Sequence, residues 1–73
     1  MKAIVVASEC TDGIQAIYVD GKLTHSKDTV YACDIVEAAE GQPIMLTQEN
    51  ADLPEDTDWP DTLAALHEMQ SVL

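Results

Sequence analysis

The 73-residue chain contains no arginine and only three lysines, against fourteen aspartates and glutamates. Its formal net charge at pH 7 is therefore -11. Affinity for phosphate backbones and for anionic membrane surfaces comes largely from lysine and arginine. The shortage of both argues against direct binding to nucleic acid and against binding to such membranes.

Aromatic residues, cysteines and long apolar runs are also scarce. There is no phenylalanine and one tryptophan, Trp59. Two cysteines, Cys10 and Cys33, do not make a disulfide framework, and nothing else in the sequence indicates secretion. The apolar run at residues 3–7 is too short for a signal-peptide core, and no segment is long enough to span a bilayer. We expect a soluble, cytoplasmic protein.

The motifs that usually carry catalysis or metal binding are missing as well. The three glycines stand apart in the sequence, so there is no glycine-rich phosphate loop. The residues that could ligate zinc form no C-x-x-C or H-x-x-x-H pair; they are Cys10, His25, Cys33 and His67. We therefore predict no enzyme activity, no cofactor and no metal.

The short length limits what the chain can enclose. A chain of this size buries roughly 60% of the surface that its unfolded form exposes, so its core is thin. An enclosed cleft would take up much of that core. Binding on an outer face is therefore favoured over catalysis in a buried site. Because 47% of the residues are apolar, we expect one folded domain over residues 1–73 rather than disorder.

Three strands are predicted in the first part of the chain. Residues 2–8 are apolar and β-branched, as in a strand covered on both faces. Residues 14–19 and 22–26 flank Asp20-Gly21, a dipeptide typical of a two-residue hairpin turn with positive φ at both positions. Together the three runs predict an antiparallel meander.

A first helix is predicted to follow the meander. Asp28 is a favourable N-cap, and Gly41 with Pro43 ends the helix. Its apolar stripe consists of Ala32, Ile35, Val36 and Ala39. Residues 44–48 then alternate well enough for a fourth strand, either at an edge of the sheet or beside the first strand.

A second helix is predicted to begin around Asp58. Pro60 suits its first turn, and Asp61 stands in the place of a capping-box acid. Its inner stripe comprises Trp59, Leu63, Leu66, Met69 or Gln70, and Leu73. The order β-β-β-α-β-α predicts a small α+β domain, with a mostly antiparallel sheet and two helices packed on one face.

The negative charge is concentrated in the second part of the chain. Residues 1–27 contain as many acids as lysines, whereas residues 28–73 contain eleven acids and no lysine or arginine. Glu37 and Glu40 stand near the end of the first helix, where they oppose its dipole, which suggests another use for their charge. A field of this sign attracts and steers a protein with a basic surface.

We predict that such a partner contacts acids on the first helix and on the loop and helix start that follow the fourth strand. Asp34, Glu37 and Glu40 would lie along one helix face, about 4.5 Å apart along the axis. Acids of the loop could continue that row. The full predicted set is Asp34, Glu37, Glu40, Glu49, Asp52, Glu55, Asp56, Asp58 and Asp61. Trp59 is a possible aromatic anchor, although packing of the second helix onto the sheet is its favoured role. The acidic segment that begins at Asn50 does not match the EF-hand calcium loop, because Glu55 stands where that template requires glycine.

Carboxylates in such a row could stand in for phosphates, and the protein would then be a DNA mimic in the basic groove of a nucleic-acid-handling enzyme. In size and charge the chain is similar to phage-encoded inhibitors of restriction, CRISPR and DNA-repair enzymes. This similarity is one of composition, and no motif identifies a family. The alternative is that the charge serves salt adaptation or solvation, in a small accessory subunit or a homodimer that uses a bare sheet face.

Overall fold

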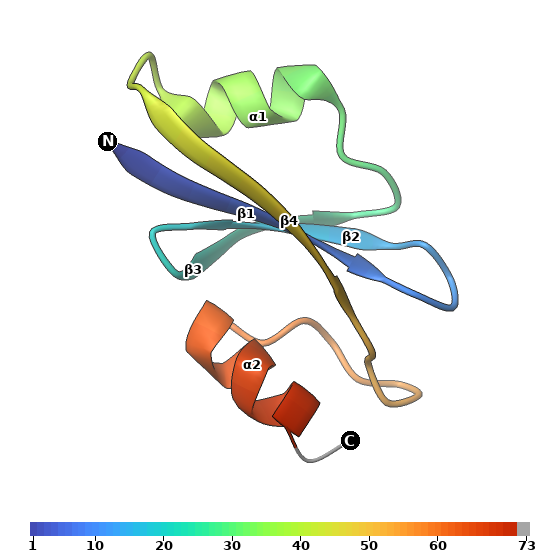
Figure 1. Cartoon of the computed structure of the whole chain (residues 1–73). Coiled ribbons are helices and arrows are strands. Elements are labelled where there is room, and N and C mark those ends of the chain that lie inside the picture. The colour runs from blue at the N-terminus through green and yellow to red at the C-terminus, as the bar shows by residue number, and fades with distance from the viewer. Residues whose placement is uncertain (72–73) are drawn as a thin grey trace.

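A computed structural model describes residues 1–71, apart from the side chain of Lys27. The chain forms four strands and two helices in the predicted order β-β-β-α-β-α (Figure 1). The elements are β1 (Lys2–Glu9), β2 (Gln15–Val19), β3 (Lys22–Lys27), α1 (Ala32–Ala39), β4 (Ile44–Ala51) and α2 (Leu63–Ser71). The predicted α+β class is confirmed.

The sheet has the order β3-β2-β1-β4. β1 pairs antiparallel with β2, and β2 pairs antiparallel with β3, so the predicted meander is confirmed. β4 lies at an edge and beside β1, with which it is parallel, and the sheet is therefore mixed. β4 extends to Ala51, three residues beyond the predicted end at Gln48.

The hairpin between β2 and β3 turns at Asp20 and Gly21, whose φ angles are 50° and 84°. Positive φ at both central residues is what a type I′ turn requires, so the predicted turn is confirmed. Beyond the turn, Tyr18 pairs with Leu23 and Ile17 pairs with His25. Thr24 is therefore an extra residue in β3, which makes a β-bulge.

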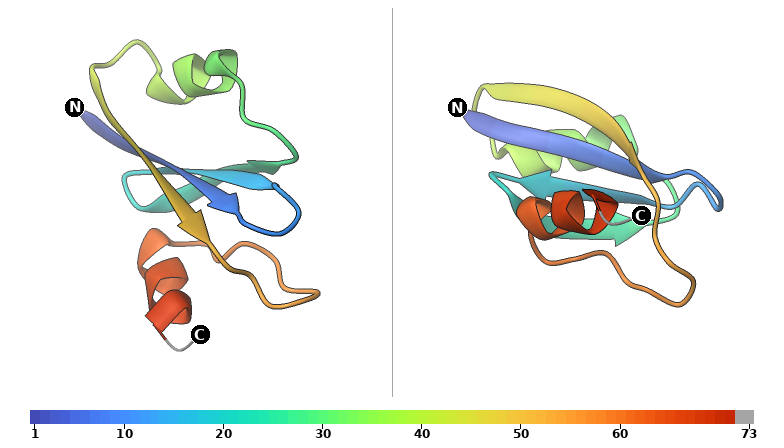
Figure 2. Two further views of the ribbon diagram at one scale, coloured as in Figure 1. Left: turned by 45° about the vertical axis from the view of Figure 1, so that its right-hand side comes forward. Right: turned by 60° about the horizontal axis from the view of Figure 1, so that its bottom comes forward.

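The two helices lie on opposite faces of the sheet (Figure 1; Figure 2), so the prediction that both pack on one face is wrong. On one face the core comprises Ile4, Ile17, Ala38 and Ala39. On the other face it comprises Ala7, Ala16, Tyr18, Ala51, Trp59 and Leu66. Successive residues of a strand point to opposite faces. Because β1 and β2 are apolar at both sets of positions, each face needs its own helix.

α1 begins at Ala32 with Tyr31 as its N-cap, so the prediction that Asp28 caps it is wrong. The carboxylate of Asp34 accepts a hydrogen bond from the backbone N–H of Tyr31 at 2.8 Å, which fixes the first turn. This start sets which residues face the sheet. The inward residues are Asp34, Ile35, Ala38 and Ala39, whereas Ala32 and Val36 of the predicted stripe are exposed.

α2 begins at Leu63, later than predicted, and its cap is Thr62, whose Oγ1 accepts the backbone N–H of Ala65 at 3.1 Å. The preceding residues make other bonds that hold them extended. The Pro60 carbonyl accepts the Tyr18 hydroxyl at 2.7 Å, and the Asp61 carbonyl accepts the Leu23 N–H at 2.8 Å. These contacts between distant residues replace the helical turn expected at Asp58.

The inner face of α2 agrees with the prediction within the described residues. Leu66 is buried, and Leu63, Met69 and Gln70 are half-buried, while Leu73 lies outside the described residues. No helix in residues 1–71 is long and apolar enough to cross a membrane.

Candidate functional site

Two acidic segments meet at one end of the sheet because β1 and β4 run in the same direction. The turn at residues 10–13 follows β1, and the loop at residues 52–62 follows β4 (Figure 1). The Cys10 N–H donates to the Ala51 carbonyl at 3.2 Å, so the segments leave the sheet side by side. Between them lies an open hollow of about 770 Å³.

Apolar residues and acids both line the hollow, and we call the apolar residues its floor and the exposed acids its rim. Ile14, Leu53 and Pro54 supply its apolar surface, and Ile14 and Leu53 also pack against the core on the α2 side. The exposed acids around it are Asp12, Glu55, Asp56 and Asp58. We call this combination of floor and rim the acidic hollow.

Glu9 also lines the hollow, but its carboxylate is used in folding the turn. Glu9 is 5% exposed and accepts hydrogen bonds from the backbone N–H groups of Asp12, at 2.6 Å, and Thr11, at 3.0 Å. These two bonds, with the bond from Asp12 the stronger cause, lower the pKa of Glu9. Glu9 therefore holds Asp12 in place, rather than being free to bind a partner.

The acidic loop is anchored at both ends. At its start, the Gln70 side-chain amide bonds both the N–H and the carbonyl of Asp52, each at 2.8 Å. At its end, the Tyr18 hydroxyl donates to the Pro60 carbonyl. Within the loop the Thr57 N–H donates to the Pro54 carbonyl at 3.1 Å, and Asp56 adopts a φ of 62°. Hydrogen bonds within the chain therefore hold both ends of the loop and its turn at residues 54–57.

Among the side chains that the structure describes, no basic group pairs with the carboxylates of the rim. In the part of the chain that the structure describes, the Lys2 ammonium pairs with the Glu40 carboxylate at 2.6 Å, and the His67 ring bonds the Glu49 carboxylate at 2.7 Å. Neither pair reaches the acidic hollow. Its charge is therefore left uncompensated within the described residues.

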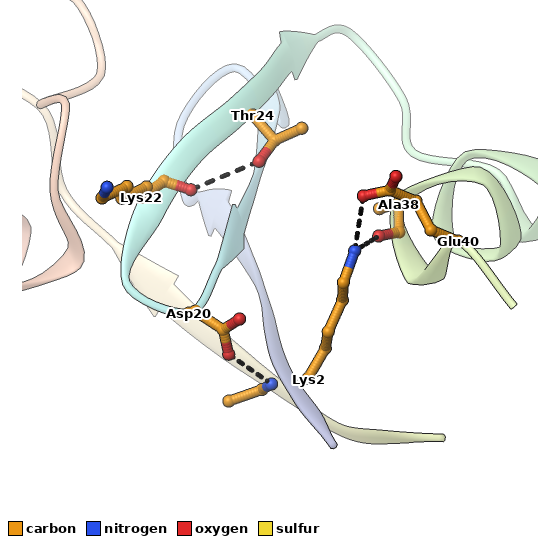
Figure 3. Close-up of polar contacts among 7 residues, drawn as sticks. Lys2, Asp20, Lys22, Thr24, Ala38 and Glu40 are labelled. Carbon is orange, nitrogen blue, oxygen red and sulfur yellow. Dashed lines mark hydrogen bonds and ion pairs between the residues drawn. The ribbon is translucent and has the colours of Figure 1, made fainter. Parts of the chain in front are cut away.

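The predicted acids of α1 do not act as one group. Glu37 and Glu40 are exposed, and the Glu40 carboxylate pairs with Lys2, whose Nζ also donates to the Ala38 carbonyl at 3.1 Å (Figure 3). The hydrogen bond and charge of Lys2 lower the pKa of Glu40. Asp34 is only 8% exposed and bonds the start of its own helix, so it does not share the exposed face expected for it.

The sequence predicted that acids of the loop could continue the row on α1, but in the structure they do not. α1 covers one face of the sheet, whereas the 52–62 loop leads to α2 on the other (Figure 1). Of the remaining predicted residues, Asp52 and Asp61 are exposed, and Glu49 is half-buried beside His67. The structure therefore brings together Glu55, Asp56 and Asp58 and leaves the other predicted acids elsewhere.

Trp59 does not serve as an exposed anchor. It is 7% exposed and packs with Tyr18 and Leu66 in the core on the α2 side, which confirms the favoured packing role. Its Nε1 is buried and has no hydrogen-bond partner among the residues that the structure describes.

Asp12 and the floor residue Ile14 are parts of the hollow that the sequence did not reveal as a site. The sequence does place Asp12 in the turn after the first strand. Asp12 can be assigned to the site only when β4 is known to run parallel to β1, because the ends of parallel strands meet at one edge of a sheet.

The chemistry of the hollow is suited to a cationic side chain. Lysine and arginine lay their aliphatic stems on apolar surface while their charged groups stay with polar neighbours. No group of three or more His, Cys, Asp or Glu residues that could hold a metal ion occurs among residues 1–71. No family model, curated protein or solved structure matches the chain.

Proposed function

We propose that the protein is a small acidic interaction module that binds a basic surface of a partner protein through the acidic hollow. The observation that carries this proposal is the set of exposed carboxylates at Asp12, Glu55, Asp56 and Asp58, around an apolar floor and without a neighbouring ion pair in the described residues. A net charge of -11 adds long-range attraction to any basic partner.

The group that the hollow would take is an exposed arginine or lysine of the partner. The stem of such a side chain would lie on Ile14 and Leu53, and its charged end would meet carboxylates of the rim. Arginine is favoured of the two, because its guanidinium can bond a carboxylate with two parallel N–H groups.

The finer form of the proposal is that the partner handles nucleic acid and that the protein inhibits it as a DNA mimic, in the manner of a phage-type antagonist of a defence or repair enzyme. Net charge and small size support this form. The rim acids surround one hollow instead of following a line, so mimicry would replace a local group of phosphates and not a stretch of one strand. Competition with duplex DNA for the purified partner tests this form.

The interaction proposal is tested with a fluorescent oligo-arginine peptide as the probe. We expect the double variant Asp56→Lys/Asp58→Lys to bind the peptide at least about 10-fold more weakly than the unchanged protein, because both charges of the rim are reversed. The matched control is Glu37→Lys/Glu68→Lys, which changes the net charge equally at two exposed helical positions outside the hollow. Fluorescence anisotropy gives the dissociation constants, and circular dichroism checks each fold.

Equal weakening by the two double variants would show that only net charge matters. That result would contradict a site at the hollow and favour the alternative in which the acids serve solvation.

A further inference from the structure

We infer that β4 pairs in antiparallel orientation with β4 of a second copy of the chain, which joins two four-stranded sheets into one. Among residues 1–71, β4 is an edge strand that pairs with β1 and with no other strand. The pairing uses none of the rim residues of the acidic hollow, so the inference stands apart from the proposed function.

The ladder between β1 and β4 shows which backbone groups of β4 face outward. At one end the Lys2 N–H donates to the Pro43 carbonyl, and at the other the Cys10 N–H donates to the Ala51 carbonyl. A parallel ladder engages alternate residues of a strand, so the odd-numbered residues of β4 bond to β1. The outward N–H and carbonyl groups therefore belong to Ile44, Leu46, Gln48 and Asn50.

The side chain of Gln70 marks where this open edge ends. Asp52 is the next even-numbered residue, and both its N–H and its carbonyl are bonded by the Gln70 amide at 2.8 Å. The amide occupies the place that a neighbouring strand would take. Within the part of the chain that the structure describes, the edge is thus closed at Asp52 and open from Ile44 to Asn50.

Over residues 44–48 the open edge of β4 lacks the features that usually prevent edge pairing. Exposed edges are protected by charges, prolines, bulges or a covering segment. The edge at β3 has several of these, since the Leu23 N–H bonds to Asp61 and a bulge lies at Thr24. Residues 44–48 have no charge and no proline, and Met45 and Leu46 are 56% and 49% exposed.

The charge pattern favours a second copy over a basic partner at this edge. Residues 44–48 are a charge-free stretch in a chain with fourteen acids, so two copies can meet there with little local repulsion. A basic segment would find no carboxylate over residues 44–48, and Glu49, at the end of the open edge, is already bonded to His67 at 2.7 Å. Two identical strands related by a twofold axis present the same outward groups to each other.

One register uses the whole open edge. With the twofold axis at Thr47, Ile44 lies opposite Asn50 and Leu46 lies opposite Gln48, so every outward group is paired. Glu49 then lies opposite Met45, and no acid faces an acid across the two strands.

The first test is the molar mass of the purified chain, measured by light scattering and sedimentation equilibrium over a range of concentrations. We expect a species of twice 7.9 kDa. Because each copy carries a charge of -11, dimerisation should strengthen as NaCl rises from about 0.1 M to about 1 M, where screening is far stronger. The affinity of a basic segment for the same edge would instead fall as NaCl rises over that range. A monomer at every concentration and salt overturns the inference.

Two variants locate the interface. Leu46→Lys places a charge at the open edge, and we expect a dissociation constant at least about 10-fold higher. Val36→Lys is the matched control, since it makes the same kind of change at a side chain of α1 that is 71% exposed, and we expect less than about a 3-fold effect. Equal effects of the two variants overturn the β4 interface.

Amide exchange measured by NMR tests the pairing itself. In the dimer the amides of Gln48 and Asn50 should exchange more slowly than in the Leu46→Lys variant, studied at a concentration where sedimentation shows that the variant is a monomer. The amides of Met45 and Thr47 bond to β1 and should be protected in both. A dimer in which the even-numbered amides exchange as in the monomer contradicts the inference.

Discussion

Tyr18 is the residue that ties the sheet to the acidic loop. Its side chain is fully buried in the core on the α2 side, and its hydroxyl donates to the Pro60 carbonyl at 2.7 Å. Burial first, and then the negative charges of Asp61 and Glu49, raise the pKa of Tyr18 to about 12. The phenol therefore keeps its proton, and with it the hydrogen bond to Pro60, to a higher pH than an exposed tyrosine would.

Replacing Tyr18 by Phe should lower the free energy of unfolding by about 0.5–1.5 kcal/mol, because the Pro60 carbonyl loses its donor. The unchanged protein should also lose stability as the pH rises from about 10 to about 12. The unfolded tyrosine ionises near pH 10 while the folded one still holds its proton, so the contribution of the raised pKa is present below pH 10 and disappears at high pH. Urea unfolding of both proteins across this range measures the two effects. An equal decline in the Tyr18→Phe variant would show that another group is responsible.

The hairpin is the element that local sequence determines most completely. Asp20 and Gly21 both have positive φ, and a Cβ added at Gly21 would meet nothing within 4 Å. The Cβ of a side chain at position 21 would therefore meet no described atom, and we expect the backbone conformation to decide the effect on stability.

We expect Gly21→Val to reduce the free energy of unfolding by about 1–2 kcal/mol, because a β-branched residue resists positive φ. Gly21→Asn should cost clearly less, since asparagine visits the left-handed region more readily. Urea denaturation of the three proteins separates the two variants. Equal losses for Val and Asn would contradict the type I′ turn as the cause.

Sequence and structure agree at the level of elements where bonding is local and disagree where it is not. The hairpin, the meander and the inner face of α2 depend on neighbouring residues, and they were predicted correctly. The start of α2 was missed because Tyr18 and Leu23 bond the segment at Pro60 and Asp61 from a distance. A scan for N-caps does not detect such contacts.

The arrangement of layers could have been predicted from β1. The sequence already indicated a strand covered on both faces, which requires a helix on each, but both helices were assigned to one face. The predicted row of acids, which joined α1 to the 52–62 loop, depended on that assignment. Because α1 covers the other face of the sheet, the acids of the 52–62 loop lie near Asp12 and not near Glu37 or Glu40. Asp12 is close to the loop because β4 runs parallel to β1, and the residues of β4 do not themselves determine that direction.

On the scale of the whole molecule, charged and uncharged surfaces are separated. The rim acids gather where β1 and β4 end, whereas the open edge of β4 is free of charge over residues 44–48. A molecule built in this way can pair through one surface and attract a basic partner through another. The two proposals are therefore compatible, and each has a test that leaves the other unaffected.

The response of the fold to salt separates an interaction module from a protein whose acids serve salt adaptation. The Debye length falls from about 30 Å at 0.01 M salt to about 8 Å at 0.15 M. The radius of gyration is 11.8 Å, so carboxylates across the whole molecule repel one another in dilute buffer and are screened at the higher salt.

We expect the Leu46→Lys variant, used as the monomer, to be folded at about 0.01 M salt and to gain thermal stability on adding NaCl to about 0.15 M. Far-UV circular dichroism with thermal melts measures both quantities. A chain that is unfolded at low salt and folds only at molar NaCl would contradict the interaction proposal and support salt adaptation, because the acids would then require screening before the core could form.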